Sequence, residues 1–141
     1  MTMMKTDEQV LKEIGEAAAG LLLMSESDCP LEPFRLEGER DAGGQPDLGR
    51  LRRLAEVSED APVEVIGFDE FFRAAVFVTL KREGGGEKAA EDRVGILRRA
   101  LTDNLSGLSV YRVGSISIAV YVVGRSAEGN FVGLSTRVVE T

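Results

Sequence analysis

The groups best suited to chemistry in this 141-residue chain are the oxygen-bearing ones at its C-terminal end. Residues 130–139 alternate as a strand does, and Glu140 and Thr141 follow directly. We therefore expect the Glu140 carboxylate, the Thr141 hydroxyl and the terminal carboxylate to project together from the end of a sheet. Carboxylates are ionised at neutral pH, and hard cations such as Mg²⁺ prefer oxygen ligands. This end of the chain therefore forms an acidic, oxygen-rich tip with the arrangement of a probe.

The remaining inventory for catalysis is small. The sequence has no histidine, which removes the commonest general base and metal ligand, and its single cysteine, Cys29, excludes a cysteine-rich zinc site. Acidic pairs such as Glu39 with Asp41 and Asp69 with Glu70 remain, but their spacing indicates solvated surface rather than a pocket. No glycine-rich nucleotide-binding motif is present. We predict that the protein is not an enzyme and has no cofactor of its own; a small hydrolase that uses carboxylates is one alternative.

Composition predicts a single acidic domain over residues 1–141. Asp and Glu outnumber Lys and Arg by 24 to 17, so the net charge is −7. This charge argues against direct binding to nucleic acid, which requires a basic face, and favours a basic protein partner, although solubility alone explains acidity equally well. The chain has no signal-peptide-like start and no apolar stretch of membrane-spanning length. With one cysteine and therefore no internal disulfide, the expected location is cytoplasmic.

Four segments show the spacing of amphipathic helices. In residues 6–23 the apolar positions recur at three- and four-residue intervals, and Thr6 or Asp7 is suited to cap the N-terminus. The other three predicted helices are a short one through Val57 that Asp47 caps, one over residues 69–76 that buries Phe68, Phe71 and Phe72, and one over residues 87–106.

The strands are predicted mainly in the last third of the chain. Short strands are expected at residues 31–37 and 63–66, followed by three at residues 110–113, 115–123 and 130–139. In the middle one of these three, both faces are apolar, with Ile116, Ile118, Val120 and Val122 on one face and Ala119, Tyr121 and Val123 on the other. A sheet with two apolar faces needs a cover on each. The expected fold is therefore α+β, a three-layer α-β-α sandwich around a largely antiparallel sheet.

Two segments far apart in the chain resemble those of one protein family. Residues 20–30, GLLLMSESDCP, are similar to the "GLLxMSESxxP" signature of the nuclease A inhibitor family. Residues 110–141, from VYRVG to GLSTRVVET, are similar to that family's C-terminal block, and residues 60–72 are similar to its middle segment. Each motif alone is weak, but the motifs in this order and with matching ends are specific.

The resemblance implies a fold of the pathogenesis-related-protein-like type and inhibition of a metal-dependent, sugar-non-specific endonuclease. In that family the C-terminus enters the nuclease active site and the terminal threonine, here Thr141, reaches the magnesium ion that the nuclease holds. The glutamate of the MSES turn, here Glu26, contacts the active-site region, while Ser25 and Ser27 are expected only to stabilise the turn. The resemblance thus implies partner-binding roles for Glu26, Glu140 and Thr141, in a monomer that forms a 1:1 complex.

A second function class stays open at this point. An acidic protein-protein interaction module could keep this fold without inhibiting any nuclease. The two classes differ in whether the Glu26 turn and the Glu140–Thr141 segment are needed for inhibition of a metal-dependent nuclease.

Overall fold

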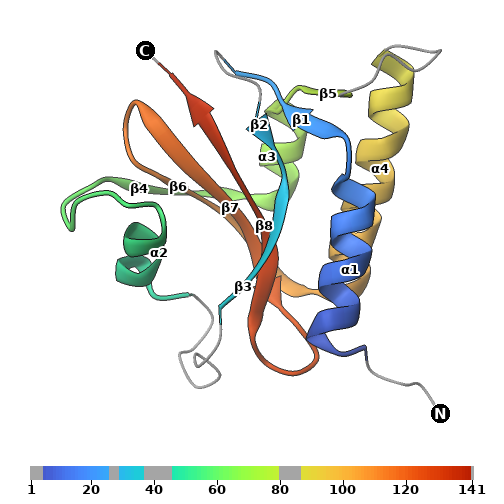
Figure 1. Cartoon of the computed structure of the whole chain (residues 1–141), viewed down its shortest axis with the longest axis horizontal. Helices are drawn as coiled ribbons and strands as arrows, with labels where there is room; N and C mark the ends of the chain where they lie inside the picture. Colours follow the sequence, from blue (N-terminus) through green and yellow to red (C-terminus); the bar gives the residue numbers. More distant parts are fainter. Residues whose placement is uncertain (1–4, 26–28, 37–45, 80–86, 141) are drawn as a thin grey trace.

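The computed structural model describes residues 5–25, 29–36, 46–79 and 87–140 (Figure 1). The described residues include four helices: α1 (Asp7–Ala18), α2 (Leu48–Leu54), α3 (Phe68–Ala74) and α4 (Glu87–Asn104). Their strands are β1 (Leu21–Leu23), β2 (Cys29–Pro30), β3 (Glu32–Leu36), β4 (Val63–Gly67), β5 (Phe77–Thr79), β6 (Ser106–Val113), β7 (Ser117–Arg125) and β8 (Phe131–Val139). None of the described helices is long and apolar enough to cross a membrane.

The main sheet has five strands in the order β3-β8-β7-β6-β4, and every neighbouring pair is antiparallel. A smaller antiparallel sheet has the order β2-β1-β5. The predicted α+β class is therefore confirmed. The likeness to pathogenesis-related proteins stays a prediction.

Two apolar cores lie on opposite faces of the main sheet, because alternate residues of each strand point to opposite sides. Val120 and Val122 of β7 belong to the core that α1, α3 and α4 complete, whereas Tyr121 and Val123 belong to the core that α2 completes. In Figure 1, α1 and α4 lie side by side on one side of the sheet and α2 lies on the other. The two faces predicted for the middle strand are thus both covered by helices. Burial raises the pKa of Tyr111 and Tyr121, whose side chains face the α2 side.

The prediction that residues 6–23 form one helix is wrong in its last turns. Helix α1 ends at Ala18, and Leu21–Leu23 forms strand β1 instead. Gly20 adopts a φ of 81°, a left-handed conformation that ends the helix and that glycine adopts without strain. Arg93 of α4 donates a hydrogen bond to the carbonyl oxygen of Ala19, which is one of the acceptors left free at the helix end. The apolar residues Leu21–Leu23 form a strand because they pair with β2 on one side and β5 on the other. Neither β2 nor β5 was predicted.

Three smaller differences concern element ends. Helix α2 stops at Leu54, before Val57, and Glu56 has a φ of 58°. Helix α3 stops at Ala74, because Ala75 is already extended with a ψ of 141°. Ile116 precedes β7 and is 61% exposed, so it does not join Ile118 on the buried face.

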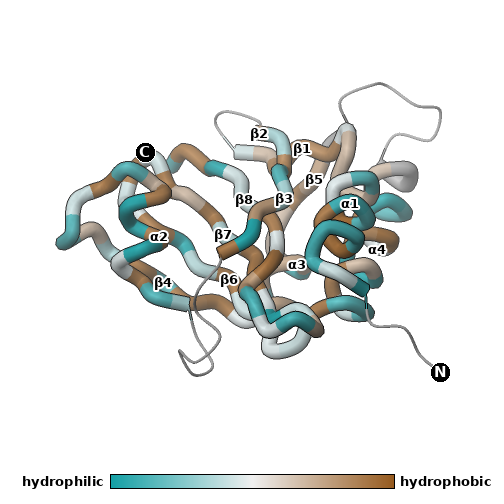
Figure 2. The backbone as a smooth tube through the Cα atoms, turned by 60° about the horizontal axis from the view of Figure 1, so that its bottom comes forward, coloured by the Kyte–Doolittle hydropathy of each residue, from teal (hydrophilic) through white to brown (hydrophobic). Residues whose placement is uncertain are grey.

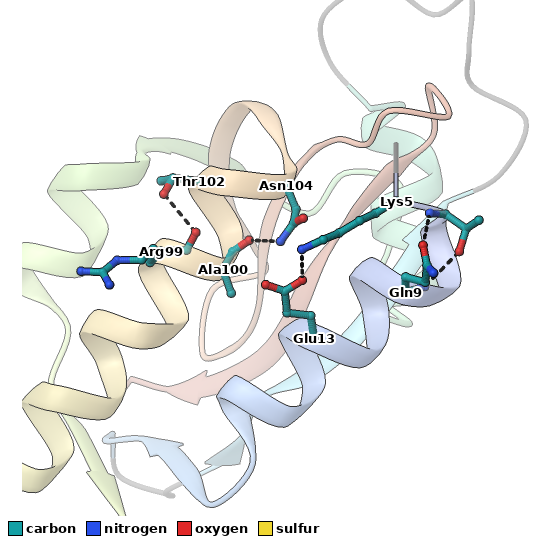
Figure 3. A network of polar contacts seen from close by, with 8 residues as sticks. Lys5, Gln9, Glu13, Arg99, Ala100, Thr102 and Asn104 are labelled. Carbon is teal, nitrogen blue, oxygen red and sulfur yellow. Dashed lines mark hydrogen bonds and ion pairs between the residues drawn. The ribbon is translucent and has the colours of Figure 1, made fainter. Parts of the chain in front are cut away.

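Local hydrogen bonds fix the start of α1 and the end of α4. Thr6 caps α1 through a capping box with Gln9, in which each side chain accepts from the other residue's backbone N–H. Lys5 bonds the Glu13 carboxylate at 2.5 Å, and Asn104 donates to the Ala100 carbonyl oxygen at 2.7 Å (Figure 3). Figure 2 shows hydrophilic and hydrophobic residues interleaved along α1, as expected for a helix with one buried face.

Asp7 does not cap α1 but reaches the turn before β8. Its side chain is 1% exposed, and its Oδ2 atom accepts a hydrogen bond of 2.8 Å from Asn130 Nδ2, which is also buried. Arg35 of β3 lies 3.8 Å from the same oxygen. The start of α1 is therefore tied to the turn between β7 and β8, and both lie at the bottom of Figure 1.

Candidate functional site

The turn between β1 and β2 is attached to the far end of β8. Ser25, the last described residue before the turn, accepts a hydrogen bond of 3.2 Å on its Oγ atom from the backbone N–H of Val139. Cys29, the first described residue after it, accepts one of 3.5 Å on its carbonyl oxygen from Thr136 Oγ1. Both sides of the turn are thus bound to one strand that lies more than 100 residues away in sequence. The Oγ atom of Ser25 thus bonds a distant strand, and the turn-stabilising role predicted for this residue stays a prediction.

Glu140 is attached to the sheet by its backbone and by its side chain. Its N–H donates to the carbonyl oxygen of Ile116 at 2.9 Å, which extends the pairing of β8 with the β6–β7 connection by one residue. Its Oε1 atom accepts a hydrogen bond of 2.6 Å from Arg112 Nη2 of β6. The Glu140 side chain is 56% exposed and that of Arg112 is 25% exposed, so the ion pair is open to solvent on one side.

The alternation of the strands explains why these two charges meet. Glu140 follows Val138 at a spacing of two, and Arg112 follows Val110 in the same way, so both side chains point to the face of the sheet that α1, α3 and α4 cover. Strand β7 lies between β6 and β8. The long arginine side chain therefore spans β7 to reach Glu140, and the carboxylate is directed across the sheet face.

A hollow of about 300 Å³ lies beside this ion pair, between the sheet face and α3. Its apolar floor consists mainly of buried residues from four elements: Leu23 of β1, Phe71 of α3, Val120 of β7 and Val138 of β8. Half-buried Ile66 of β4 adds to it. Helices α1 and α4 do not contribute to this hollow. We name it the α3 hollow.

The edge of the α3 hollow carries exposed apolar and charged side chains. Met24 and Val76 are 48% and 51% exposed and are joined by a backbone hydrogen bond of 2.8 Å from Met24 N–H to the Val76 carbonyl. Glu70, Arg112 and Glu140 supply the charges. The edge of the α3 hollow is thus partly apolar and partly charged.

The predicted site residues differ in what the structure says of them. Glu140 is described, whereas Glu26 and Thr141 lie outside the described residues, and the binding roles predicted for all three stay predictions. The structure brings together Ser25 and Val139, the neighbours of Glu26 and Glu140 in sequence. No group of three or more acidic or cysteine side chains suited to a metal ion occurs among the residues described.

The acidic pairs considered for catalysis do not form a site. The Asp69 carboxylate accepts a hydrogen bond of 2.9 Å from Arg98 of α4. The Asp69 side chain is 78% exposed, so this ion pair lies on the surface. Glu70, its neighbour, lies at the edge of the α3 hollow, while Glu39 and Asp41 lie outside the described residues.

Sequence reasoning missed Arg112, Met24 and Val76. Arg112 carried a usable signal, since it is the one charged residue between Asp103 and Arg125 in a stretch of apolar strands. Met24 and Val76 carried none, because their pairing depends on β1 and β5, which were not predicted.

Comparison with known proteins agrees with the family resemblance seen in residues 20–30 and 110–141. No curated protein matches the chain. The family model described as "Nuclease A inhibitor-like protein" matches residues 8–141, which is nearly the whole chain. The chain belongs to the nuclease A inhibitor-like protein family.

Proposed function

We propose that this protein inhibits a metal-dependent, sugar-non-specific endonuclease by occluding its active site with Glu140 and Thr141 and with the turn that contains Glu26. Family membership supports the nuclease-inhibiting role. One observation supports the choice of surface: the hydrogen bond between Ser25 Oγ and Val139 N–H joins the two segments that carry these three residues. A single nuclease active site can then meet both segments at once.

The chemistry of a nuclease cleft fits such a surface. The cleft must attract phosphate and is therefore basic, and its Mg²⁺ ion prefers oxygen ligands. Carboxylates at residues 26 and 140 supply negative charge without a scissile P–O bond, and the Thr141 hydroxyl is the group proposed to approach the magnesium ion of the nuclease. The metal belongs to the partner, and the inhibitor needs no cofactor of its own.

The attachments of Glu140 favour tight insertion. Its backbone bond to Ile116 and its ion pair with Arg112 hold Glu140 itself in place at the end of the sheet. A segment that is ordered before binding loses less conformational entropy in the complex, which raises affinity. The net charge of −7 further speeds encounter with a basic cleft at low salt and argues against direct binding to nucleic acid. The proposed complex is one inhibitor monomer with one nuclease, in the cytoplasm.

Two variants test this proposal: Glu26→Ala and a chain that ends at Val139. Each is assayed for inhibition of a magnesium-dependent nuclease, with nuclease A as the first choice, on both DNA and RNA, and thermal unfolding confirms that it is folded. Both variants should lose inhibition by at least about 10-fold, the loss expected when a central interface group is removed. Undiminished inhibition by the shortened chain would exclude the insertion mechanism. If the intact protein binds no such nuclease, an acidic interaction module becomes the better description.

A further inference from the structure

We infer that the α3 hollow receives a long basic side chain, lysine or arginine, from the rim of the nuclease cleft. This inference rests on the proposed function and adds a second contact, beside the inserted segment rather than within it. The hollow and the segment share Glu140, so a nuclease that meets one surface also covers the other.

The shape and lining of the hollow suit such a side chain. Its volume of about 300 Å³ is at the lower limit for small-molecule pockets, which makes a single long side chain a suitable occupant. The floor at Phe71, Val120 and Val138 is apolar. Lysine and arginine bury an aliphatic stem against apolar surface while the charged group stays at the polar edge.

The charges at the edge favour a cation over a neutral group. Arg112 bonds Glu140 at 2.6 Å, so these two charges largely balance each other. Glu70 is exposed on α3, and within the described part of the chain no ion pair or hydrogen bond of its carboxylate is recorded. The edge therefore carries a net negative charge, which comes from Glu70, and an incoming ammonium or guanidinium group can pair with that carboxylate.

The source of the cation follows from the chemistry of the partner. A cleft that binds the phosphates of DNA and RNA without regard to sequence is surrounded by lysine and arginine. The α3 hollow lies next to the segment proposed to enter that cleft, so its edge faces the basic rim. Charge complementarity thus selects a basic occupant over the purely apolar one that the floor alone would also accept.

Two substitutions in α3 test the inference separately for shape and for charge. Ala74→Leu adds apolar volume inside the hollow, with Ala74→Ser as the control that leaves it open. Glu70→Gln removes the charge and keeps the shape, with Glu59→Gln as the control, since Glu59 is an exposed carboxylate in the connection after α2. The dissociation constant for nuclease A is measured at several salt concentrations for all four variants and for the unaltered protein.

The inference predicts that Ala74→Leu weakens binding by at least about 10-fold and Glu70→Gln by roughly 3- to 10-fold, and that Glu70→Gln also lowers the salt dependence. The two controls should bind as the unaltered protein does. Loss with Ala74→Leu but none with Glu70→Gln would contradict a basic occupant and indicate an apolar one. Tight binding by every variant would overturn the inference and leave the proposed function intact, whereas no binding by the unaltered protein would remove both.

Discussion

The two ends of strand β8 carry polar pairs of opposite character. Before the strand, Asn130 bonds the carboxylate of Asp7 at 2.8 Å, and both side chains are buried. After the strand, Glu140 bonds Arg112 at 2.6 Å, with the carboxylate more than half exposed beside the α3 hollow. Removal of one partner of a buried pair costs stability because the other group has no water as a substitute, whereas an exposed pair contributes little to stability. The comparison indicates that one end of β8 maintains the fold and the other is available to a partner.

The largest effect is expected at the buried end. Asp7→Ala removes the acceptor of Asn130 Nδ2 and leaves a buried amide unsatisfied, which should lower the free energy of unfolding by about 2–3 kcal/mol. Urea unfolding followed by circular dichroism measures this change. Glu8→Ala, at the exposed neighbouring position, is the control and should change stability by less than about 0.5 kcal/mol.

Nuclease inhibition by the folded Asp7→Ala variant should be unchanged. If this variant were as stable as the unaltered protein, the buried pair would not have the role assigned to it. If it stayed stable but lost inhibition, the Asn130 end of β8, rather than the Glu140 end, would be the one that binds the nuclease.

An intermediate effect is expected at the exposed end, and it concerns binding rather than stability. Arg112→Ala removes the partner of Glu140 and should lower stability by less than about 1 kcal/mol, as for other exposed pairs. Inhibition should weaken by about 10-fold, because the Glu140 side chain is no longer held by Arg112 before binding. Inhibition constants and urea unfolding of the same preparations separate the two quantities.

Exchange of the two charges sharpens this prediction. The double variant Arg112→Glu with Glu140→Arg restores the ion pair but reverses the charge at position 140. Partial recovery of inhibition relative to Arg112→Ala would show that Glu140 acts mainly by orienting the next residue. Inhibition weaker than that of Arg112→Ala would show instead that the Glu140 carboxylate contacts the nuclease directly.

The fold was predictable from sequence where the pattern is local. The strand pattern predicted over residues 115–123 and the helical spacing predicted over residues 87–106 each repeat within a few residues, and both gave the right type of element. The strand begins at Ser117 and the helix ends at Asn104, so the predicted ends were wrong by two residues. Leu21–Leu23 is too short to distinguish a helix end from a strand, and its state depends on pairing with β5, more than 50 residues away. The glycine at position 20 was a local signal that the helix ends before Leu21, since the residue adopts a left-handed conformation there.

The candidate site was predictable only in part for the same reason. Glu140 stands out in sequence as an acidic residue directly after a strand. Its partner Arg112 lies 28 residues earlier, and the contact exists only because β7 separates β6 and β8 in the right register. Ser25 was predicted to stabilise a turn, but its bond to Val139 spans 114 residues, and sequence patterns contain no information at that range.

The smallest effect is expected at the exposed ion pair between Lys5 and Glu13 of α1. The hydrogen bond from Lys5 lowers the pKa of Glu13 below its ordinary value of 4.5. Since the folded pKa is the lower one, the stabilisation is present above pH 4.5 and is lost as the pH falls through the folded value. Glu13→Gln should therefore lower stability by less than about 0.5 kcal/mol at pH 7 and leave it unchanged at pH 2.

Urea unfolding at the two pH values measures this difference. A loss at pH 7 as large as that of Asp7→Ala would contradict the distinction between buried and exposed polar pairs on which the comparison rests.

The most direct test of the central claim is amide hydrogen exchange of the protein, free and in complex with nuclease A, read residue by residue. The account predicts slower exchange in the complex at Met24, Ser25 and Glu140, around the open end of β8, and at Val76 beside the α3 hollow. It predicts no change at Asn130 and the first turn of α1. Protection at the Asn130 end, or a complex that leaves the Glu140 end unprotected, would contradict the assignment of the binding surface.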